Sequence, residues 1–425
     1  MNRVDTFDAV VVGAGPAGTA TATALAQHGR RVLVLEREKF PRYHVGESLI
    51  PFTYHALERL GMIPRLRASA FPKKFSVQFV APSGRASQPF YFFNRYDRET
   101  VAQTWQVLRS EFDQMLVDNA RGKGVDIREQ VVVTGFLREN GRHVGVRATL
   151  PDGSVREFRA PVTVDATGRE ALAATTYAWR RNDPMLRKVA VWTYYEGALR
   201  DPGIDAGGTT VAFIPDKGWF WYIPQHNDRI SVGVVADGKY LARDGVKDPA
   251  EIFHREVKEN KWIEAHLAPG RPCGEYWLTN EYTFRSLHSA ADGLVLVGDS
   301  FGFLDPVFSS GLMLALKSGV LAADAIDAAL RAGDTASTRF EPYAREMHES
   351  VENMRKLVYA FYDKNVSFRT VTDRYPEVAG DLTDCLSGDV NKDFTRMFGA
   401  FSEFTTLPEA LPYGMPAPAG TVFAP

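Results

Sequence analysis

The stretch DAVVVGAGPAGTATATALAQHGRRVLVLE, residues 8–36, decides the fold of this chain. A short β-rich run leads into GAGPAG, which places glycines at Gly13, Gly15 and Gly18. A helical pattern and a second strand follow, and that strand ends at Glu36. Strand, glycine-rich turn, helix and strand, with an acid about twenty residues past the glycines, are the context of a dinucleotide-binding βαβ unit. We therefore predict an α/β fold with a Rossmann-like nucleotide-binding domain.

The three glycines of this unit each meet a steric requirement. Gly13 allows the tight turn, Gly15 lets the backbone approach a pyrophosphate, and Gly18 lets the helix pack closely on the strand. Backbone amides at the start of the helix, around Ala17, are free to bind the anion. These features predict a binding site for the phosphates of a dinucleotide.

Glu36 indicates which dinucleotide fits. Its carboxylate is placed to accept hydrogen bonds from the adenosine ribose, and an acid at this position disfavours a 2′-phosphate. Arg37 follows directly and is the second residue that we assign to the nucleotide at this point. FAD or NAD is therefore expected rather than NADP.

The composition of the chain bounds its class. A length of 425 residues favours two or three lobes, and a net charge of −2 argues against an electrostatic nucleic-acid binder. Cys273 and Cys385 are the only cysteines and lie far apart in the sequence, which fits a reducing cytoplasm rather than a disulfide framework. The histidines and carboxylates show no metal-ligand spacing, so no metal is expected.

No segment has the pattern of a leader or a membrane span. The first residues, MNRVDTFDAVVVGAG, lack the charged, apolar and cleavage regions of a signal peptide. Residues 312–330 are the most apolar stretch, but Lys317, Asp324 and Asp327 interrupt it, so we expect a buried or amphipathic helix. The resulting expectation is a cytoplasmic protein without a membrane span.

A second nucleotide motif lies far downstream. A strand over residues 294–297 runs into GDSFGFLDP, residues 298–306, and a long helix pattern follows. This arrangement resembles FAD-dependent proteins of the aromatic-hydroxylase type. The resemblance implies that Asp299, after Gly298, binds the flavin ribityl chain, and that the cofactor is FAD.

Two further segments match the same kind of flavoprotein. DATGR, residues 165–169, resembles the strand-terminal motif in which the backbone passes near the nucleotide, and it contributes Asp165 and Gly168. Arg109, in WQVLRSEFDQML, stands where these proteins have an arginine that contacts the cofactor. The alternative for Arg109 is a surface salt bridge.

Four more segments occur in the order found in flavin-dependent halogenases. They are HVGESLIP (44–51), FPKKFSVQF (71–79), GWFWYIP (218–224) and FLDPVFSSG (303–311). The chain resembles in particular the branch of that family that acts on phenol- or pyrrole-type substrates, often carried on an acyl or peptidyl carrier protein. The resemblance covers most of the chain.

The first and last of these segments are implied to surround the flavin and the halide. A halide needs donor-rich backbone, and small residues at a helix N-terminus supply amide groups and a favourable dipole. The same Ser-Ser-Gly could also be simply a helix cap. The residues assigned in this way are Gly46, Glu47 and Ser48 to the flavin-contacting loop, Pro306 to the cofactor motif, and Ser309, Ser310 and Gly311 to the halide.

The GWFWYIP run alternates its tryptophans. Period-two alternation predicts a strand with Trp219 and Trp221 on one face, ending in Ile223 and Pro224. The resemblance identifies the run as the WxWxIP motif, which keeps the organic substrate away from the flavin so that halogenation replaces hydroxylation. The alternative from the residues alone is a core strand that buries aromatic side chains.

Lys74 is the predicted catalytic residue. Alignment of FPKKFS with the family's FxxKxG pattern selects Lys74 rather than Lys73, with Ser76 in place of the usual glycine. The resemblance implies that this amine takes chlorine as a chloramine, or hydrogen-bonds hypohalous acid and polarises it. In a strand the two lysines face opposite ways, and burial together with the like charge of Lys73 would lower the pKa of Lys74. The alternative is a pair of solvated lysines on an edge strand.

Together these segments imply an FAD-dependent halogenase of natural-product biosynthesis. Reduced FAD, molecular oxygen and chloride or bromide would give hypohalous acid, which halogenates an electron-rich aromatic. A separate flavin reductase would supply reduced FAD, because no second GxGxxG for a built-in nicotinamide site is visible. Phe308 stands where tryptophan halogenases carry a glutamate, so a phenol or a pyrrole is expected rather than free tryptophan.

Two other functions stay open. A flavin monooxygenase or a prenyl (geranylgeranyl-type) reductase of the same fold shares the GAGPAG, DATG and GD…DP motifs. Those enzymes normally lack WxWxIP together with the FPKK lysine. A redox-inactive protein that keeps the fold and only holds a carrier protein is the other alternative, and the intact lysine and halide loop argue against it.

The expected architecture is α/β with an α+β second lobe and a helical C-terminal region. Residues 1–70, 101–175 and 286–335 should form the FAD-binding domain. Alternating apolar and aromatic runs in 71–100 and 176–285 predict an antiparallel substrate-lobe sheet. Residues 336–425 begin as helix and end in a Pro-rich tail that is expected to lie extended on the surface. Three aromatic residues of this region are either pocket or core, with core favoured: Tyr359, Phe361 and Tyr362.

Overall fold

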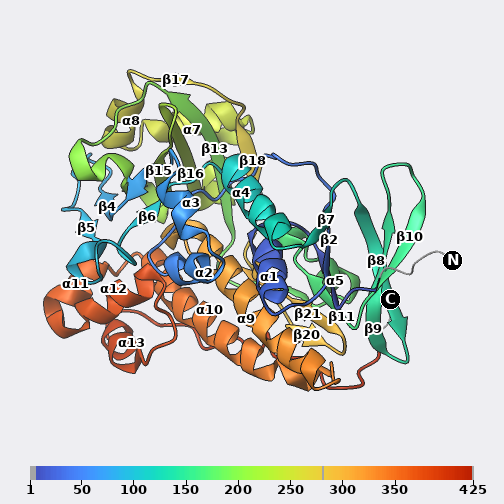
Figure 1. The fold of residues 1–425 in the computed structure, drawn as a ribbon. Coiled ribbons are helices and arrows are strands. Elements are labelled where there is room, and N and C mark those ends of the chain that lie inside the picture. The colour runs from blue at the N-terminus through green and yellow to red at the C-terminus, as the bar shows by residue number, and fades with distance from the viewer. Residues whose placement is uncertain (1–5, 280–281, 424–425) are drawn as a thin grey trace.

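The nucleotide-binding half of the molecule is built on a sheet whose strands come from distant parts of the chain (Figure 1). The computed structural model describes residues 6–279 and 282–423. The strand order is β20-β21-β11-β1-β2-β7, and every pair is parallel except the edge pair β20-β21. The strands are β1 (Ala9–Val12), β2 (Val32–Leu35), β7 (Asp126–Arg128), β11 (Val162–Asp165), β20 (Ala290–Ala291) and β21 (Leu294–Leu296).

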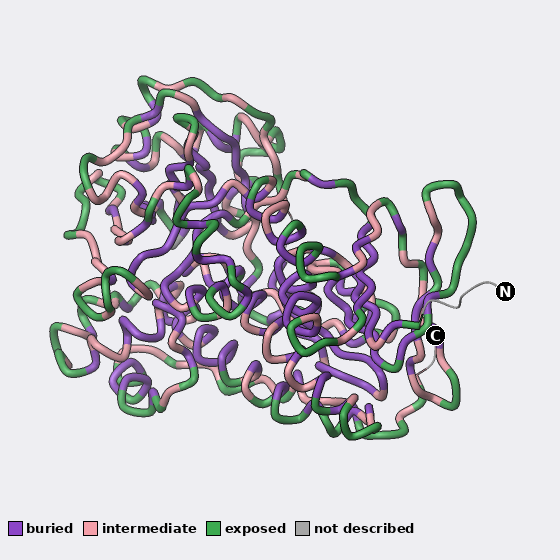
Figure 2. Tube along the Cα trace, in the orientation of Figure 1, coloured by how far each residue is buried: buried purple, intermediate pink, exposed green. Residues whose placement is uncertain are grey.

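Two helices with small side chains meet beside this sheet. In α1 (Pro16–Gln27), alanine and threonine predominate, which lets α9 (Gly311–Arg331) approach closely. A side chain at Gly319 would stand 2.6 Å from the carbonyl oxygen of Ala17, so the helices touch at a glycine. Most of the apolar stretch 312–330 is buried in α9, which confirms the buried helix predicted there. The residues of α1, α9 and the parallel sheet that face one another are buried and appear in purple in Figure 2.

The second half is an eight-stranded sheet in the order β17-β13-β16-β15-β14-β4-β5, with β18 beside β13. The sequence predicted an antiparallel sheet, and all pairs are antiparallel except β4-β14, which is parallel. The exception follows from the chain path, because the chain crosses the nucleotide-binding half between these strands and can return in either direction. The strands are β4 (Ser76–Val80), β5 (Phe90–Tyr91), β13 (Lys188–Glu196), β14 (Thr209–Phe213), β15 (Trp219–Pro224), β16 (Arg229–Asp237), β17 (Arg271–Pro272) and β18 (Trp277–Thr279).

The outer face of this sheet has its own apolar core. Phe220 of β15 packs against Phe253, whose ring lies 5.7 Å away between centroids. Phe253 belongs to α7 (Pro249–Val257), which covers that face together with α6 (Gly238–Leu241) and α8 (Lys261–Leu267). These helices leave the inner face uncovered, and that face lies toward the nucleotide-binding half.

The C-terminal region is helical and then extended, as predicted. α10 (Glu341–Tyr362) packs along α9, and α11 (Phe368–Arg374), α12 (Ala379–Ser387) and α13 (Thr395–Ser402) lie at one end of the molecule (Figure 1). The tail beyond these helices runs along the edge near β20, where the amide of Ala417 donates to the carbonyl of Ala290 at 2.8 Å. Of the three aromatic residues at the end of α10, Phe361 is buried in the core, and Tyr359 and Tyr362 are partly buried and pack against it. None of the three lines the cavity.

Smaller elements complete the fold. An antiparallel three-stranded sheet projects from the nucleotide-binding half beside β7 (Figure 1); its outer strand β10 is mostly exposed, and its middle strand β9 is half-buried (Figure 2). It consists of β8 (Val132–Glu139), β9 (Arg142–Thr149) and β10 (Val155–Arg159). The other elements are α2 (Thr53–Arg59), α3 (Ile63–Arg67), β3 (Lys73–Lys74), β6 (Thr104–Trp105), α4 (Arg109–Gly122), α5 (Leu172–Thr176), β12 (Arg180–Asn182), β19 (Phe284–Ser286) and β22 (Gly302–Phe303).

Within residues 6–279 and 282–423, the helices are too short or too polar to cross a bilayer. The same described ranges contain no cluster of three His, Cys, Asp or Glu side chains arranged to hold a metal ion. Residues 1–5, 280–281 and 424–425 lie outside the described residues. The sequence assigns them to the N-terminal segment, the substrate lobe and the Pro-rich tail.

Candidate active site

A cavity of about 630 Å³ lies between the parallel sheet and the inner face of the eight-stranded sheet. Its walls come from the glycine-rich turn, the 42–48 loop, the start of α4, the 166–170 loop, strands β13 to β15 and residues 297–315. Most of the site residues chosen from sequence line it. They are Gly13, Gly15, Ala17, Glu36, Arg37, Gly46, Glu47, Ser48, Arg109, Gly168, Trp219, Trp221, Ile223, Asp299, Pro306, Ser309 and Gly311.

Six predicted site residues do not line the cavity. Two of them are glycines whose absent side chains allow close packing behind the turn, since a Cβ at Gly18 would stand 2.0 Å from the carbonyl oxygen of Gly13. The others lie behind the cavity surface. The six are Gly18, Lys74, Asp165, Pro224, Gly298 and Ser310.

The glycine-rich turn has the geometry that a pyrophosphate requires. Gly13 has a φ of +103°, and a Cβ there would stand 2.5 Å from the carbonyl oxygen of Ala166. Gly13 is therefore fixed as glycine by both conformation and space. A Cβ added at Gly15 would stand 3.6 Å from a guanidinium nitrogen of Arg42, so this position is open and faces a cation. The helix N-terminus and this guanidinium together form a site for the negative charge of phosphates.

Glu36 is held in place at the end of β2. Its carboxylate accepts hydrogen bonds from the amides of Ala14 at 2.7 Å and Glu38 at 2.9 Å. These contacts fix the carboxylate at the cavity wall, where it can accept hydrogen bonds from a ribose. Arg37 forms an exposed ion pair with Glu170 on the opposite rim of the cavity.

Arg109 holds the 44–48 loop against the cavity. Its guanidinium forms a buried bidentate pair with Asp113 at 2.7 and 2.9 Å. It also donates to the carbonyl oxygens of Val45 at 3.0 Å and Gly46 at 3.2 Å. Arg109 therefore lies in a buried network and not in a surface salt bridge. The Nδ1 of His44 donates to the carbonyl of Val45 at 2.6 Å and lies 3.1 Å from the same guanidinium. Burial lowers the pKa of His44 to about 3, so its ring is neutral.

The GD segment brings a buried acid to the cavity. Burial raises the pKa of Asp299 to about 6, while the nearby Arg169 and Arg109 act in the opposite direction. Gly298 has a φ of +60°, and a Cβ there would stand 2.7 Å from the Cβ of Ala17. The missing side chain thus lets the GD turn approach the start of α1, which brings Asp299 to the same cavity as the glycine-rich turn.

Asp165 shapes the DATGR loop from behind. Its carboxylate accepts from the amide of Thr167 at 3.0 Å and from the amide of Ala173 at 2.6 Å. The Thr167 hydroxyl adds a third bond at 2.6 Å. Asp165 therefore positions Gly168 at the cavity wall and does not itself face the cavity.

The two tryptophans of β15 lie on the cavity side of the sheet, with ring centroids 6.2 Å apart. Trp221 packs over Gly233 of the neighbouring strand, where a Cβ would stand only 2.4 Å from the indole ring. Ile223 continues this wall, whereas Pro224 turns away from the cavity. The wall is thus a cavity surface as well as a packed strand.

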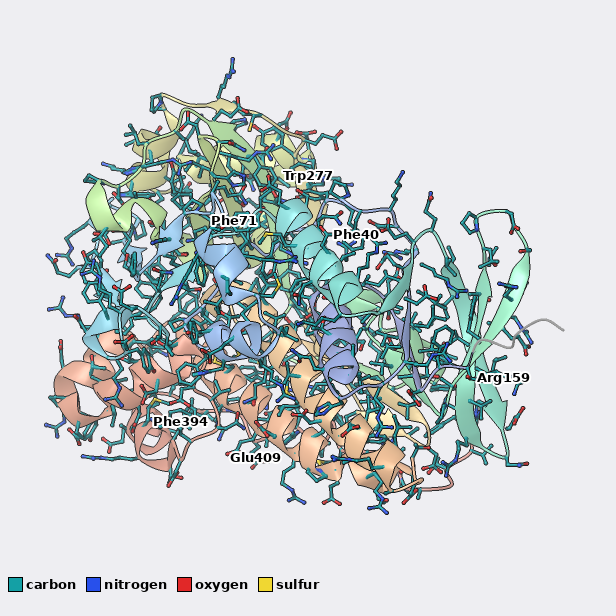
Figure 3. All side chains as sticks on the ribbon, viewed as in Figure 1. Phe40, Phe71, Arg159, Trp277, Phe394 and Glu409 are labelled. Carbon is teal, nitrogen blue, oxygen red and sulfur yellow. The ribbon has the colours of Figure 1, made fainter. Side chains whose placement is uncertain are left out.

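Other aromatic residues extend this wall and were not predicted from the sequence. Trp192 of β13 lies 6.4 Å from Trp221 and 6.1 Å from Trp277 between ring centroids. Tyr43 stacks on Trp277, which is labelled in Figure 3, at 4.9 Å. The VAVWTYY alternation marked β13 as a strand, but the sequence did not show that Trp192 would face the cavity. Arg42, Thr209 and Tyr282 also line the cavity without having been predicted.

The predicted halide loop leads into α9. Within this loop, Asp305 caps the short turn Pro306–Phe308, where the amide of Val307 donates to the Asp305 carboxylate at 3.1 Å. Ser309 adopts a left-handed conformation with a φ of +56° and lines the cavity, whereas Ser310 is buried behind it. A Cβ at Gly311 would meet no atom within 4 Å, so this position opens onto free space.

Lys74 lies directly behind the cavity wall. Its amine is buried and donates to the Ser48 hydroxyl at 2.8 Å and to the Leu49 carbonyl at 3.0 Å. Burial lowers the pKa of Lys74 to about 7. Lys73, the preceding residue, is exposed, as the alternation of a strand predicted. Ser48 lines the cavity, so one hydrogen bond separates the amine from it.

The fold and the cavity define an FAD-dependent enzyme of the aromatic-hydroxylase type. A family model described as tryptophan halogenase matches residues 8–105 and 92–372. The chain belongs to this tryptophan halogenase family, and it is a flavin-dependent halogenase of electron-rich aromatics. The monooxygenase and prenyl reductase alternatives are not favoured.

Individual relatives cover most of the chain. A 1H-pyrrole-2-carbonyl-(peptidyl-carrier protein) chlorinase of Pseudomonas fluorescens is 28% identical over 404 residues, which span 90% of this chain and 89% of the relative. A tryptophan 2-halogenase of Chondromyces crocatus is 31% identical over 369 residues, which span 85% of this chain and 69% of the relative.

Solved structures show the same fold. The flavin-dependent brominase Bmp2 superposes with a TM-score of 0.84 at 26% identity, covering 94% of this chain and 99% of Bmp2. The myxobacterial chondrochloren halogenase CndH, described as an FAD-dependent halogenase, superposes with a TM-score of 0.79 at 32% identity, covering 91% of each chain. The α/β architecture expected from the sequence is that of these enzymes.

Proposed function

We propose that this enzyme transfers halogen through Lys74 to a pyrrole- or phenol-type ring that is delivered on a carrier protein. The observation that carries the assignment is a buried amine without a carboxylate partner among the described residues, one hydrogen bond behind the cavity wall. A buried lysine with these contacts has little structural purpose, because its burial opposes its charge.

The cavity walls have distinct roles in this proposal. Gly13, Gly15, Glu36 and Arg109 would hold FAD, and Asp299 would contact its ribityl chain. When bound in reduced form, FAD supplies with oxygen the oxidising power that turns halide into hypohalous acid. The remaining steps depend on side chains and backbone groups of the protein.

The halide would bind at the start of α9. Ser309, Ser310 and Gly311 precede or begin that helix, whose free amides and dipole favour an anion. The open space at Gly311 admits an ion that a side chain there would displace. Product formation with chloride and with bromide identifies the native halide.

The tryptophans of β15 would act as a barrier. Trp219 and Trp221 occupy the cavity surface that lies opposite the nucleotide-binding half, and both are braced by hydrogen bonds. An aromatic substrate held beyond this wall cannot approach the flavin, whereas the much smaller hypohalous acid can pass. Halogenation therefore replaces hydroxylation.

The neutral amine of Lys74 would receive the halogen. Its nitrogen lone pair forms the N–X bond, the O–X bond of hypohalous acid breaks, and the hydroxide released takes the amine proton to become water. The aromatic carbon then attacks the halogen, the N–X bond breaks with its electron pair left on nitrogen, and the ring proton passes to that nitrogen and restores the amine. With a pKa of about 7, roughly half of the amine is neutral at pH 7, against one part in about a thousand for an ordinary lysine.

The partners follow from the relatives and from the sequence. The chlorinase relative acts, by its name, on a pyrrole-2-carbonyl group attached to a peptidyl-carrier protein, and we propose the same mode of delivery here. Phe308 is buried against Phe361 and Phe368 where a glutamate is expected in enzymes for free tryptophan. A separate reductase supplies reduced FAD, and the reaction takes place in the cytoplasm.

The test compares the wild-type enzyme with Lys74→Met, using Lys73→Met as the matched control. Each protein receives FAD, a flavin reductase, NADH and chloride or bromide. The probes are free pyrrole-2-carboxylate, a phenol, tryptophan and a pyrrole-2-carbonyl carrier protein. We expect a halogen isotope pattern in the carrier-bound product from wild type and Lys73→Met, and none from Lys74→Met.

Three outcomes would contradict parts of the proposal. Normal halogenation by Lys74→Met would refute the lysine assignment. Halogenation of free tryptophan alone would refute the pyrrole or phenol substrate class. Equal rates on the free acid and on the carrier-bound probe would refute the need for a carrier protein.

A further inference from the structure

Each turnover of a halogenase consumes protons in the cavity in which hypohalous acid forms. Oxygen, halide, two electrons and three protons give one hypohalous acid and one water. The electrons and two of the protons come with fully reduced FAD, so one further proton must reach the cavity. The need for this proton follows from halogenase activity, and the structure contains a path that could deliver it.

Glu47 is a buried acid in the cavity wall, next in sequence to the partner of Lys74. It is 2% exposed, lines the cavity and directly precedes Ser48, the hydrogen-bond partner of Lys74. The hydroxyl of Tyr194 donates to its Oε1 at 2.7 Å. Its Oε2 is buried and has no hydrogen-bond partner within the described residues. One oxygen of Glu47 is thus bonded to Tyr194 of β13, and the other, in a residue that lines the cavity, is left without a hydrogen-bond partner in the described part of the chain.

Tyr43 continues the connection to solvent. Its hydroxyl lies 3.3 Å from that of Tyr194, and 47% of the residue is exposed. The indole N–H of Trp192 donates to the Tyr43 oxygen at 2.7 Å. Because the Tyr194 proton is committed to Glu47, the hydrogen bond between the tyrosines takes its proton from Tyr43. The three side chains therefore form a directed chain from the half-exposed Tyr43 at the cavity rim to the buried Glu47.

We propose that Tyr43, Tyr194 and Glu47 relay protons from solvent to the cavity in which hypohalous acid forms. Glu47 releases the proton on Oε2 to the reacting oxygen, and its Oε1 takes the proton of Tyr194. Tyr194 takes the proton of Tyr43, and Tyr43 takes one from water. Only O–H bonds break and form, no electron moves, and rotation of the hydroxyls restores the chain.

The electrostatic surroundings suit this role. Burial raises the pKa of Glu47, and interactions with Ser231, Tyr194, Gln225 and Arg109 oppose that shift only in part. Glu47 therefore holds its proton to a higher pH than an exposed glutamate does.

The two tyrosines stay neutral in the same surroundings. Burial raises the pKa of Tyr43 and that of Tyr194, and Arg229 lies 4.7 Å over the ring of Tyr194. A neutral hydroxyl both donates and accepts, which is what a relay requires.

An infrared experiment on the FAD-free protein tests the relay independently of turnover. We expect a carboxylic acid band that persists to a higher pH than that of an exposed glutamate, that Glu47→Gln removes and that Tyr194→Phe shifts. Tyr195→Phe is the matched control, because Tyr195 is the next residue of β13 and packs in the opposite core against Phe253. A spectrum that Glu47→Gln leaves unchanged, or a band that Tyr194→Phe does not move, would overturn the proposal.

Kinetics provide the second test. We expect halogenation to fall about 100-fold in Glu47→Gln. In Tyr194→Phe we expect it to fall with a larger solvent deuterium isotope effect, while the FAD dissociation constant stays the same. Tyr195→Phe should behave as wild type. A Tyr194→Phe enzyme with the wild-type rate and isotope effect would refute the relay. A wild-type enzyme that halogenates none of the probes would instead refute the proposed substrate class, and the infrared result would still decide the relay.

Discussion

The indole N–H of Trp219 donates a 2.8 Å hydrogen bond to the hydroxyl of Tyr362, which donates at 3.0 Å to the buried carboxylate of Asp305. This chain joins three separate segments: the wall strand β15, the end of helix α10 and the cap of the halide loop. Burial raises the pKa of Asp305 to about 6, and the Lys188 amine lies 4.3 Å over the ring of Tyr362. The orientation of the wall tryptophan is therefore fixed by the C-terminal helical region.

Tyr362→Phe should loosen the barrier. The N–H of Trp219 would lose its acceptor in the interior, at a cost of about 1–3 kcal/mol in the free energy of unfolding. With the indole less constrained, we expect less halogenated product and more hydrogen peroxide per NADH consumed, at unchanged FAD affinity. Tyr359→Phe, one turn earlier and bonded to Asp183, is the control. Unchanged coupling in Tyr362→Phe would show that the bond does not orient the wall.

Gly233→Ala should distort the same wall from the other side. A methyl group at this position would stand 2.4 Å from the Trp221 ring and 2.4 Å from the Cβ of Trp192. Neither ring has room to withdraw within a packed sheet, so we expect a loss of about 1–3 kcal/mol in stability. Urea denaturation measures that loss, and product yield per NADH measures the damage to the barrier. Gly135→Ala is the control, since its added methyl group would meet no atom within 4 Å.

The sequence predicted which residues come together at the cavity where a motif fixes the backbone. Gly13 shows why, because its positive φ and the 2.5 Å approach of the Ala166 carbonyl exclude any other residue. Period-two alternation likewise predicted that Lys74 and Lys73 face opposite ways. Such requirements are local, so they are visible in the amino-acid sequence itself.

The sequence could not predict contacts that tertiary packing creates. Tyr362 follows Trp219 by 143 residues, and nothing near either residue indicates their hydrogen bond. The parallel pairing of β4 with β14 was missed for the same reason, since it depends on how the chain returns to the sheet. Trp192 was placed on a strand but not on the cavity, because which face is covered depends on helices elsewhere.

Arg42→Met should weaken FAD binding without unfolding the protein. Its guanidinium lies next to the open position at Gly15 and 3.5 Å from the carboxylate of Asp113. Removal of this cation takes away a charge-assisted contact to the pyrophosphate, so we expect the FAD dissociation constant to rise about tenfold. Fluorescence titration with FAD measures the change, with Lys39→Met on the neighbouring exposed surface as the control. Equal affinities would place the phosphates away from Arg42.

The burial of Lys74 predicts a stability effect whose sign depends on pH. Its pKa is lowered to about 7 in the folded protein, whereas the unfolded chain titrates near the ordinary lysine value of about 10.4. Between these values the unfolded state binds more protons, so wild-type stability rises with pH through this range and falls as pH drops toward 7. Below about 7 the full penalty of a buried charge is present.

Lys74→Met removes this penalty while it keeps an unbranched side chain of similar length. We expect the variant to exceed wild type by about 1–3 kcal/mol in free energy of unfolding at pH 7, after the loss of the bonds to Ser48 and Leu49, and the gain to shrink as pH approaches 10. Urea denaturation at several pH values measures it, with the exposed Lys73→Met as the control. A difference that grows with pH, or a variant less stable than wild type at pH 7, would mean that the amine is a stabilising contact, and the argument for a functional lysine would lose its thermodynamic basis.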